Sequence, residues 1–145
     1  MSVPPPPADP GDAHDLRIAV ARLARRIRTE RAVTEVGNSQ MSVIGLLASH
    51  GSLTLTELCE LERITPPSMT RTVSQLVDDG YVARTPSAED GRKILLELTE
   101  RGRELAAETR RRRDAWFSHR LEDLTSEERA QLRAAVPVLR KLADS

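Results

Sequence analysis

The chain has 145 residues and carries 22 Lys plus Arg against 22 Asp plus Glu, so its formal net charge is zero. This length is typical of one domain with its own hydrophobic core. With 39% hydrophobic and 30% charged residues, the composition excludes a wholly disordered chain and a membrane protein. The first residues lack the basic and apolar segments of a secretory signal, so we expect a cytoplasmic protein. A single cysteine, Cys59, excludes a scaffold held by intrachain disulfides.

Proline and charge patterns divide the N-terminal part of the chain. Residues 1–13 contain five prolines and few side chains to bury, so they predict a disordered tail ahead of a single domain at residues 14–145. From Leu16 to Val33, apolar residues recur at helical spacing with six arginines between them. We therefore expect a long first helix with one apolar and one strongly basic face.

Breaks and capping residues predict three shorter helices in the centre of the chain. Gly37 ends the first helix, and Asn38 or Ser39 can cap a second one over Gln40–Ser49. After a brief extended piece, a Thr and a Glu three residues apart form a capping box for a helix at about residues 55–63. The next helix, expected at 66–79, begins with a threonine followed by a proline at the first helical position.

The C-terminal half predicts a hairpin and two further helices. Two strands are expected at Tyr81–Thr85 and Lys93–Leu98, joined by a turn-rich tip. Thr99 can cap a second long helix that runs through Leu121, and a capping box opens a last helix ending near Ala143. Within that last helix, Pro137 predicts a kink or a late start. The expected fold is mainly α with a small β-hairpin: a winged helix-turn-helix flanked by long helices.

The expected helix at 66–79 separates an apolar arc from a polar one on a helical wheel. The apolar arc, which must face the core, contains Met69, Val73, Leu76 and Val77. The opposite arc holds only small or polar side chains: Pro67, Ser68, Thr70, Arg71, Ser74, Gln75 and Asp78. Small hydroxyls allow a backbone to approach DNA phosphates, and Arg71 and Gln75 can make bidentate contacts with guanine and adenine. A solvated polar face of an ordinary surface helix accounts for the same wheel.

The expected hairpin tip carries cations beside a carboxylate. Asp90, Gly91 and Arg92 follow one another and precede Lys93. An arginine at the end of a protruding loop fits a narrow minor groove, whose negative potential attracts a guanidinium group. An ordinary charged turn is the alternative interpretation.

These motifs together resemble the multiple antibiotic resistance regulator (MarR) family of bacterial transcription factors. The shared elements are Leu55–Leu58 before the turn, Ser68, Thr70 and Arg71 in the recognition helix, Leu76–Tyr81 at its exit, Asp90-x-Arg92 in the wing, and Leu98-Thr99-x-x-Gly102 beyond it. They lie between Gln40 and Gly102, and the flanking helices fit the same architecture.

The resemblance implies a homodimeric repressor that binds double-stranded DNA at a pseudo-palindromic operator. Ser68, Thr70 and Arg71 would contact the major groove, Arg92 would enter the minor groove, and Asp90 would brace Arg92. A small lipophilic or phenolic ligand would release the protein from DNA, and no cofactor, metal or membrane is implied. Residues 38–98 would form the winged module, and residues 14–37 and 99–145 would supply the dimerisation helices.

Apolar faces on the flanking helices favour a dimer, independently of the family resemblance. These faces are too long to be buried on the module at 38–98, and a two-fold dimer is the commonest way to cover them. A monomer that folds the helices back on its own module is the alternative. The apolar residues on the C-terminal pair are Leu105, Ala106, Trp116, Phe117, Leu121, Leu124, Leu132, Val136, Leu139 and Leu142.

Other chemistries find little support in the sequence. Cys59 falls on the inner face of its helix with no nearby cation to stabilise a thiolate, which favours an inert buried thiol over a redox switch. The three histidines are dispersed, so no metal site is expected. No nucleophile elbow or glycine-rich loop indicates an enzyme. A winged module that binds protein rather than DNA remains the second hypothesis, from which Arg71 and Arg92 would distinguish DNA binding.

The zero net charge hides a segregated distribution. Residues 16–31 carry six arginines against one glutamate, and residues 101–113 carry six against two. The module at 63–93 holds five cations against four carboxylates. We therefore expect weak non-specific DNA binding, with affinity that depends on a few placed arginines rather than on bulk charge.

Overall fold

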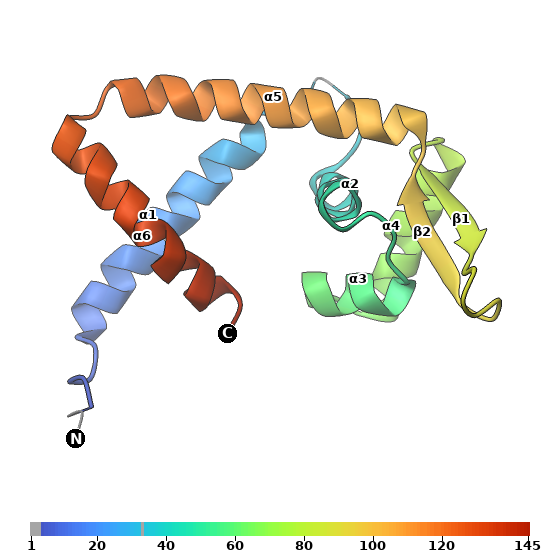
Figure 1. The fold of residues 1–145 in the computed structure, drawn as a ribbon, viewed down its shortest axis with the longest axis horizontal. Coiled ribbons are helices and arrows are strands. Elements are labelled where there is room, and N and C mark those ends of the chain that lie inside the picture. The colour runs from blue at the N-terminus through green and yellow to red at the C-terminus, as the bar shows by residue number, and fades with distance from the viewer. Residues whose placement is uncertain (1–3, 33) are drawn as a thin grey trace. The chain divides into compact units, whose positions relative to one another are not determined.

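The computed structural model describes residues 4–32 and 34–145, and that part of the chain is mainly helical with one antiparallel hairpin (Figure 1). The elements are α1 Pro10–Thr29, α2 Asn38–His50, α3 Leu55–Glu62, α4 Pro66–Asp78, β1 Val82–Pro86, β2 Ile94–Leu98, α5 Glu100–Glu122 and α6 Ser126–Ala143. The predicted fold class is confirmed. The chain divides into two compact units, one of residues 31–111 and one of the residues up to 30 together with 112–145.

The unit at residues 31–111 holds the hydrophobic core. Its members come from α2, α3, α4, the hairpin and the short segments that precede α2, α3 and β1, and they are almost entirely aliphatic, as the scarcity of aromatic residues requires. The largest side chains that are fully buried are Ile44, Leu47, Leu58, Met69, Leu76 and Val43. Three helices and the hairpin therefore share one core, which fixes their mutual orientation.

Capping interactions set the helix starts in this unit. Thr54 and Glu57 form the predicted box: the Thr54 backbone N–H donates to Glu57 Oε2 at 2.7 Å, and the Glu57 N–H donates to Thr54 Oγ1 at 3.2 Å. The hydrogen bonds from the Thr54 backbone and hydroxyl lower the pKa of the Glu57 carboxyl. The expected cap of α2 at Asn38 or Ser39 was wrong, because Gly37 is the N-cap and its N–H donates to Gln40 Oε1 at 2.8 Å.

The hairpin pairs Val82 with Leu98 and Pro86 with Ile94, so each strand starts one residue later than expected. Leu53 adds a short extended piece beside β2: its N–H and C=O pair with the backbone of Leu96 at 3.1 and 2.8 Å. The hairpin is thereby attached to the segment that leads into α3.

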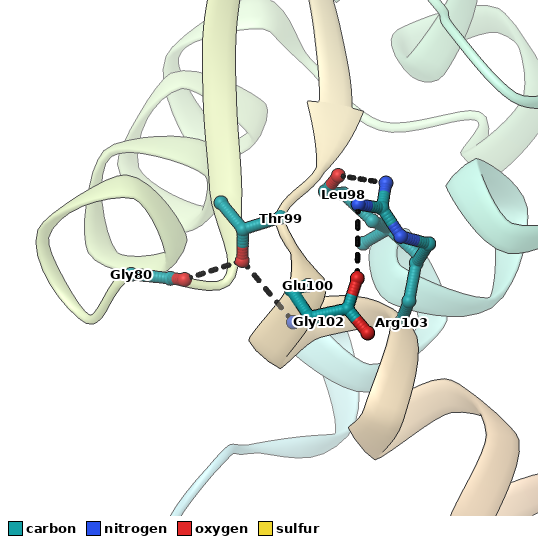
Figure 2. A network of polar contacts seen from close by, with 6 residues as sticks. All are labelled: Gly80, Leu98, Thr99, Glu100, Gly102 and Arg103. Atoms are coloured by element: carbon teal, nitrogen blue, oxygen red, sulfur yellow. Dashed lines mark hydrogen bonds and ion pairs between the residues drawn. The ribbon is translucent and has the colours of Figure 1, made fainter.

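A compact polar junction joins the end of α4, the start of β1 and the start of α5 (Figure 2). Thr99 donates its hydroxyl to the Gly80 carbonyl at 2.6 Å and accepts from the Gly102 N–H at 3.2 Å. Gly102 is buried against the Tyr81 backbone, and a Cβ there would run into the Tyr81 carbonyl oxygen. The Leu-Thr-x-x-Gly motif thus has a physical meaning: Thr99 ties the helix start to the α4 exit, and Gly102 permits the close approach.

The other unit contains α1, the last part of α5 and α6. Neither α1 nor α6 contains a buried residue. Two arginines lie over the Trp116 ring, with the guanidinium carbons of Arg26 and Arg120 at 5.4 and 5.7 Å from its centroid. Arg113 also donates to the Glu30 carbonyl at 3.1 Å.

The ends of these flanking helices differ from the sequence prediction. Helix α1 begins at Pro10, inside the segment expected to be a disordered tail, because Asp9 caps it by accepting from the Gly11 N–H at 2.8 Å. It ends at Thr29, earlier than expected; Val33 and the first three residues lie outside the described part. Helix α6 begins at its predicted capping box and continues through Pro137, so the late start was wrong.

Gly102→Ala should destabilise the fold by about 1 to 3 kcal/mol, because the added methyl forces apart the α4 exit and the start of α5. Urea unfolding followed by circular dichroism measures this. Gly45→Ala is the matched control, since that helical glycine has open space around its missing Cβ and should gain up to about 1 kcal/mol. Equal stability of Gly102→Ala and wild type would contradict the junction as described.

Candidate DNA-binding surface

Helix α4 presents the polar arc that the sequence predicts. Met69, Val73 and Leu76 are buried, and Val77 packs partly buried against the same core. Of the predicted site residues on the opposite side, only Ser74 is partly buried. The exposed ones are Pro67, Ser68, Thr70, Arg71 and Gln75. Because the core residues of α4 are fixed by their neighbours, the polar arc is held outward in a single orientation.

The N-terminus of α4 has few backbone donors. Pro66 and Pro67 lack N–H groups, so Ser68 carries the first backbone N–H of the helix. Thr65 makes no side-chain cap; its hydroxyl donates to Ser68 Oγ at 3.2 Å instead. The Ser68 hydroxyl therefore keeps its own proton for an outside acceptor, at the positive end of the helix dipole.

Two arginines on this surface have no side-chain partner in the described part of the chain. Arg71 lies on the exposed arc of α4, and Arg92 lies in the tip between β1 and β2. Neither guanidinium group takes part in an ion pair or a hydrogen bond within residues 4–32 and 34–145. An exposed guanidinium with five free donors suits contact with phosphates or guanine edges.

The tip of the hairpin is held by a set of short hydrogen bonds. Asp90 Oδ1 accepts from the Arg92 backbone N–H at 3.1 Å, and the Lys93 N–H donates to the Asp90 carbonyl at 3.0 Å. Ser87 Oγ accepts from the Asp90 N–H at 3.3 Å. Asp90 thus orders the backbone of residue 92 rather than its guanidinium, which differs from the expected brace. Arg92 and Lys93 both project from an ordered turn and are exposed.

The far end of α4 has a different character. Gln75 is not free, because its Oε1 accepts from Gln40 Nε2 at 3.0 Å. It lines an open hollow of about 970 Å³ whose rim includes three carboxylates, Glu35, Asp78 and Asp79, and one cation, Arg101. The basic and hydroxyl-bearing residues therefore lie toward the start of α4, and acidic residues gather at its end.

The structure adds one basic residue that the sequence reasoning missed. Arg84 of β1 reaches α4, where its Nη2 donates to Ser74 Oγ at 3.4 Å. Arg84 and Thr70 also line a small apolar depression of about 250 Å³. The alternation of side chains along a strand could have predicted this position of Arg84. It lies two residues after the buried Val82 and so faces the same side of the hairpin.

The cysteine, possible metal ligands and possible membrane spans bear on whether the chain holds another kind of site. Cys59 is partly buried against the core, as its inner-face position predicts. Within the described residues, no group of three His, Cys, Asp or Glu side chains is placed to hold a metal ion. No helix of that part is long and apolar enough to cross a bilayer.

Comparison with known sequences identifies relatives over nearly the whole chain. A sequence model of the MarR family matches residues 37–94. An uncharacterized HTH-type transcriptional regulator of Mycobacterium bovis is 41% identical over 132 residues, which cover 91% of this chain and 92% of the relative. The HTH-type transcriptional repressor MdtR of Bacillus subtilis is 30% identical over 135 residues, which cover 90% and 85% of the two chains.

Solved structures share the fold. A transcriptional regulator of Pseudomonas aeruginosa superposes with a TM-score of 0.76 at 30% identity, covering 92% of this chain and 93% of the other. FabT of Streptococcus pneumoniae, solved in complex with DNA, superposes with a TM-score of 0.74 at 19% identity, covering 92% and 94%. With the helix-turn-helix and wing in place and the sequence relatives covering most of its length, the chain belongs to the MarR family of transcriptional regulators.

Proposed function

We propose that this protein is a homodimeric repressor that binds a pseudo-palindromic operator through α4 and the hairpin tip. The main support for this proposal is the pair Arg71 and Arg92. Both arginines are exposed, lie in the same compact unit, and have guanidinium groups without a partner in the described residues. A surface that served only solubility would tolerate ion pairs at both positions. DNA binding requires both guanidinium groups to be available.

The recognition helix should enter the major groove by its N-terminal half. Ser68, Thr70 and Arg71 lie there, and the carboxylates of Asp78 and Asp79 at the other end would repel phosphates. Helix-turn-helix proteins read base edges with the N-terminal residues of this helix. Among the predicted site residues, Pro67 and Ser74 border this region, whereas Gln75 would need to leave Gln40 in order to read a base.

The wing should place Arg92 in the adjacent minor groove. Its ordered turn keeps the loss of backbone entropy on binding small, and Lys93 beside it can meet a flanking phosphate. Asp90 contributes by fixing the turn.

A second copy of the chain is the proposed partner of α1 and α6. Their large apolar side chains are open to solvent in one chain: Leu16 is 53% exposed, Val138 60% and Leu142 61%. Helices that bury nothing within their own chain gain stability by packing on a partner, and a two-fold pair also supplies two recognition helices for paired half-sites.

Repression by operator occupancy and release by a ligand complete the proposal. MdtR, a relative over most of the chain, carries the name of a repressor. MepR of Staphylococcus aureus, which shares this fold, has been solved bound to ethidium bromide. The depression beside α4 is small and mostly apolar, with Thr70 and Arg84 as its polar lining residues, which suits a single-ring lipophilic or phenolic ligand.

Arg71→Ala and Arg92→Ala should each weaken binding to the DNA upstream of the protein's own gene by about 1 to 3 kcal/mol, because each removes a guanidinium that contacts a groove. Fluorescence anisotropy with a labelled duplex measures the loss. Arg71→Ala should also relax the preference at one base pair in each half-site.

Arg22→Ala is the matched control, since Arg22 is equally exposed but lies on α1. It should bind as wild type does. If the two site variants also bind like wild type, the surface is not the DNA-binding one, and a module that contacts protein becomes the better account.

Ligand release predicts a linked effect on stability and affinity. A single-ring phenolic compound at about 100 times its dissociation constant should stabilise the protein by about 2.7 kcal/mol and raise its melting temperature by several degrees. The same compound should weaken operator binding. A panel of phenolic and lipophilic compounds that shifts neither quantity would contradict the ligand part of the proposal.

A further inference from the structure

Arg84 occupies a strand position where the core of the hairpin ends. The inner face of the hairpin contains three cross-strand pairs, Val82 with Leu98, Arg84 with Leu96, and Pro86 with Ile94. On β2, Leu98 and Leu96 are buried, whereas Ile94 near the tip is 47% exposed, so Leu96 opposite Arg84 is the last buried residue of this face. Arg84 therefore faces the side of α4 at the edge of the buried part, and its own side chain is exposed.

One hydrogen bond holds this side chain beside the recognition helix. Arg84 Nη2 donates to Ser74 Oγ at 3.4 Å, and no carboxylate in the described residues pairs with the guanidinium. A guanidinium has five N–H donors, so most of them stay available after this single contact. Ser74, half-buried on α4, thus acts as a neutral support that leaves the positive charge uncompensated.

The position of Arg84 determines which part of a bound DNA duplex it could contact. It lies between α4 and the tip that carries Arg92. If α4 enters the major groove and the tip enters the neighbouring minor groove, the sugar-phosphate strand that separates the two grooves must pass between them. A cation located between the two elements faces phosphate oxygens rather than base edges.

We propose that Arg84 clamps the phosphate backbone between the two grooves and that Ser74 positions it. The inference rests on the proposed function and adds a contact that neither the recognition helix nor the wing tip supplies. Phosphate contacts fix the register of a protein on the duplex without reading sequence. Arg84 would therefore set how the helix and the wing engage together.

Salt dependence of DNA binding by the full chain tests this assignment. Each phosphate contact contributes about 0.9 to the slope of log affinity against log salt. Arg84→Ala should lower that slope by about this amount for each bound Arg84. For each lost contact, the ratio of wild-type to Arg84→Ala affinity should fall by about 3.5-fold between 50 and 200 mM salt. The loss should be equal for operator and unrelated duplex, whereas Arg84→Lys should keep the slope and lose less affinity.

The Ser74→Ala variant tests whether Ser74 positions Arg84 or contacts DNA itself. It should weaken binding less than Arg84→Ala does, leave the salt slope unchanged, and add nothing when Arg84 is already alanine. A Ser74→Ala loss that persists in the Arg84→Ala background would overturn the positioning role. Melting temperatures of all variants should match wild type, because both side chains lie outside the buried core.

The outcomes distinguish this inference from the function on which it rests. If wild type binds the operator and Arg84→Ala binds with the same affinity and slope, the clamp is wrong and the function stands. If Arg84→Ala changes the preference for one base at an unchanged slope, Arg84 reads a base and the clamp is also wrong. If the wild-type protein itself shows no salt-dependent binding to the operator, the proposed function is wrong.

Discussion

The contact between Gly102 and the Tyr81 backbone is the constraint on which the placement of α4 and the hairpin depends, and with it the proposed DNA-binding surface. It brings the first turn of α5 against the point where α4 ends and β1 begins, and Thr99 locks that approach by bonding to Gly80 (Figure 2). Arg101 strengthens the same junction by donating to the Asp79 carbonyl at 2.7 Å and lying over the Tyr81 ring. Since the hairpin leaves from this junction, the spacing between recognition helix and wing tip follows from it.

Charge on this unit is arranged by position rather than by amount. Arg71, Arg84 and Arg92 lie around the start of α4 and the hairpin, whereas Asp78 and Asp79 lie at the end of α4. A neutral chain can bind a polyanion if its cations are grouped and left unpaired where phosphates arrive. In the proposed complex, the carboxylates at the end of α4 would repel phosphates and the arginines near its start would attract them, which would set the direction of α4 in the groove.

Local signals predicted most of the elements, and tertiary contacts account for the rest. The boxes at Thr54 and Thr125 are encoded within four residues, so the starts of α3 and α6 could be read directly. The polar arc of α4 follows from its 3.6-residue period. The start of α1 was missed because a tail rich in proline obscured the cap at Asp9. Arg84 was missed because its place depends on which face of a strand packs on α4, and the Asp90 contact depends on the geometry of the turn.

Hydroxyl-radical footprinting of the protein on its upstream DNA shows whether two winged modules bind one duplex as a pair. We expect two protected half-sites whose centres lie about one helical turn, or about 10 base pairs, apart, with two chains bound per duplex. Protection of a single half-site by one chain would contradict this paired binding.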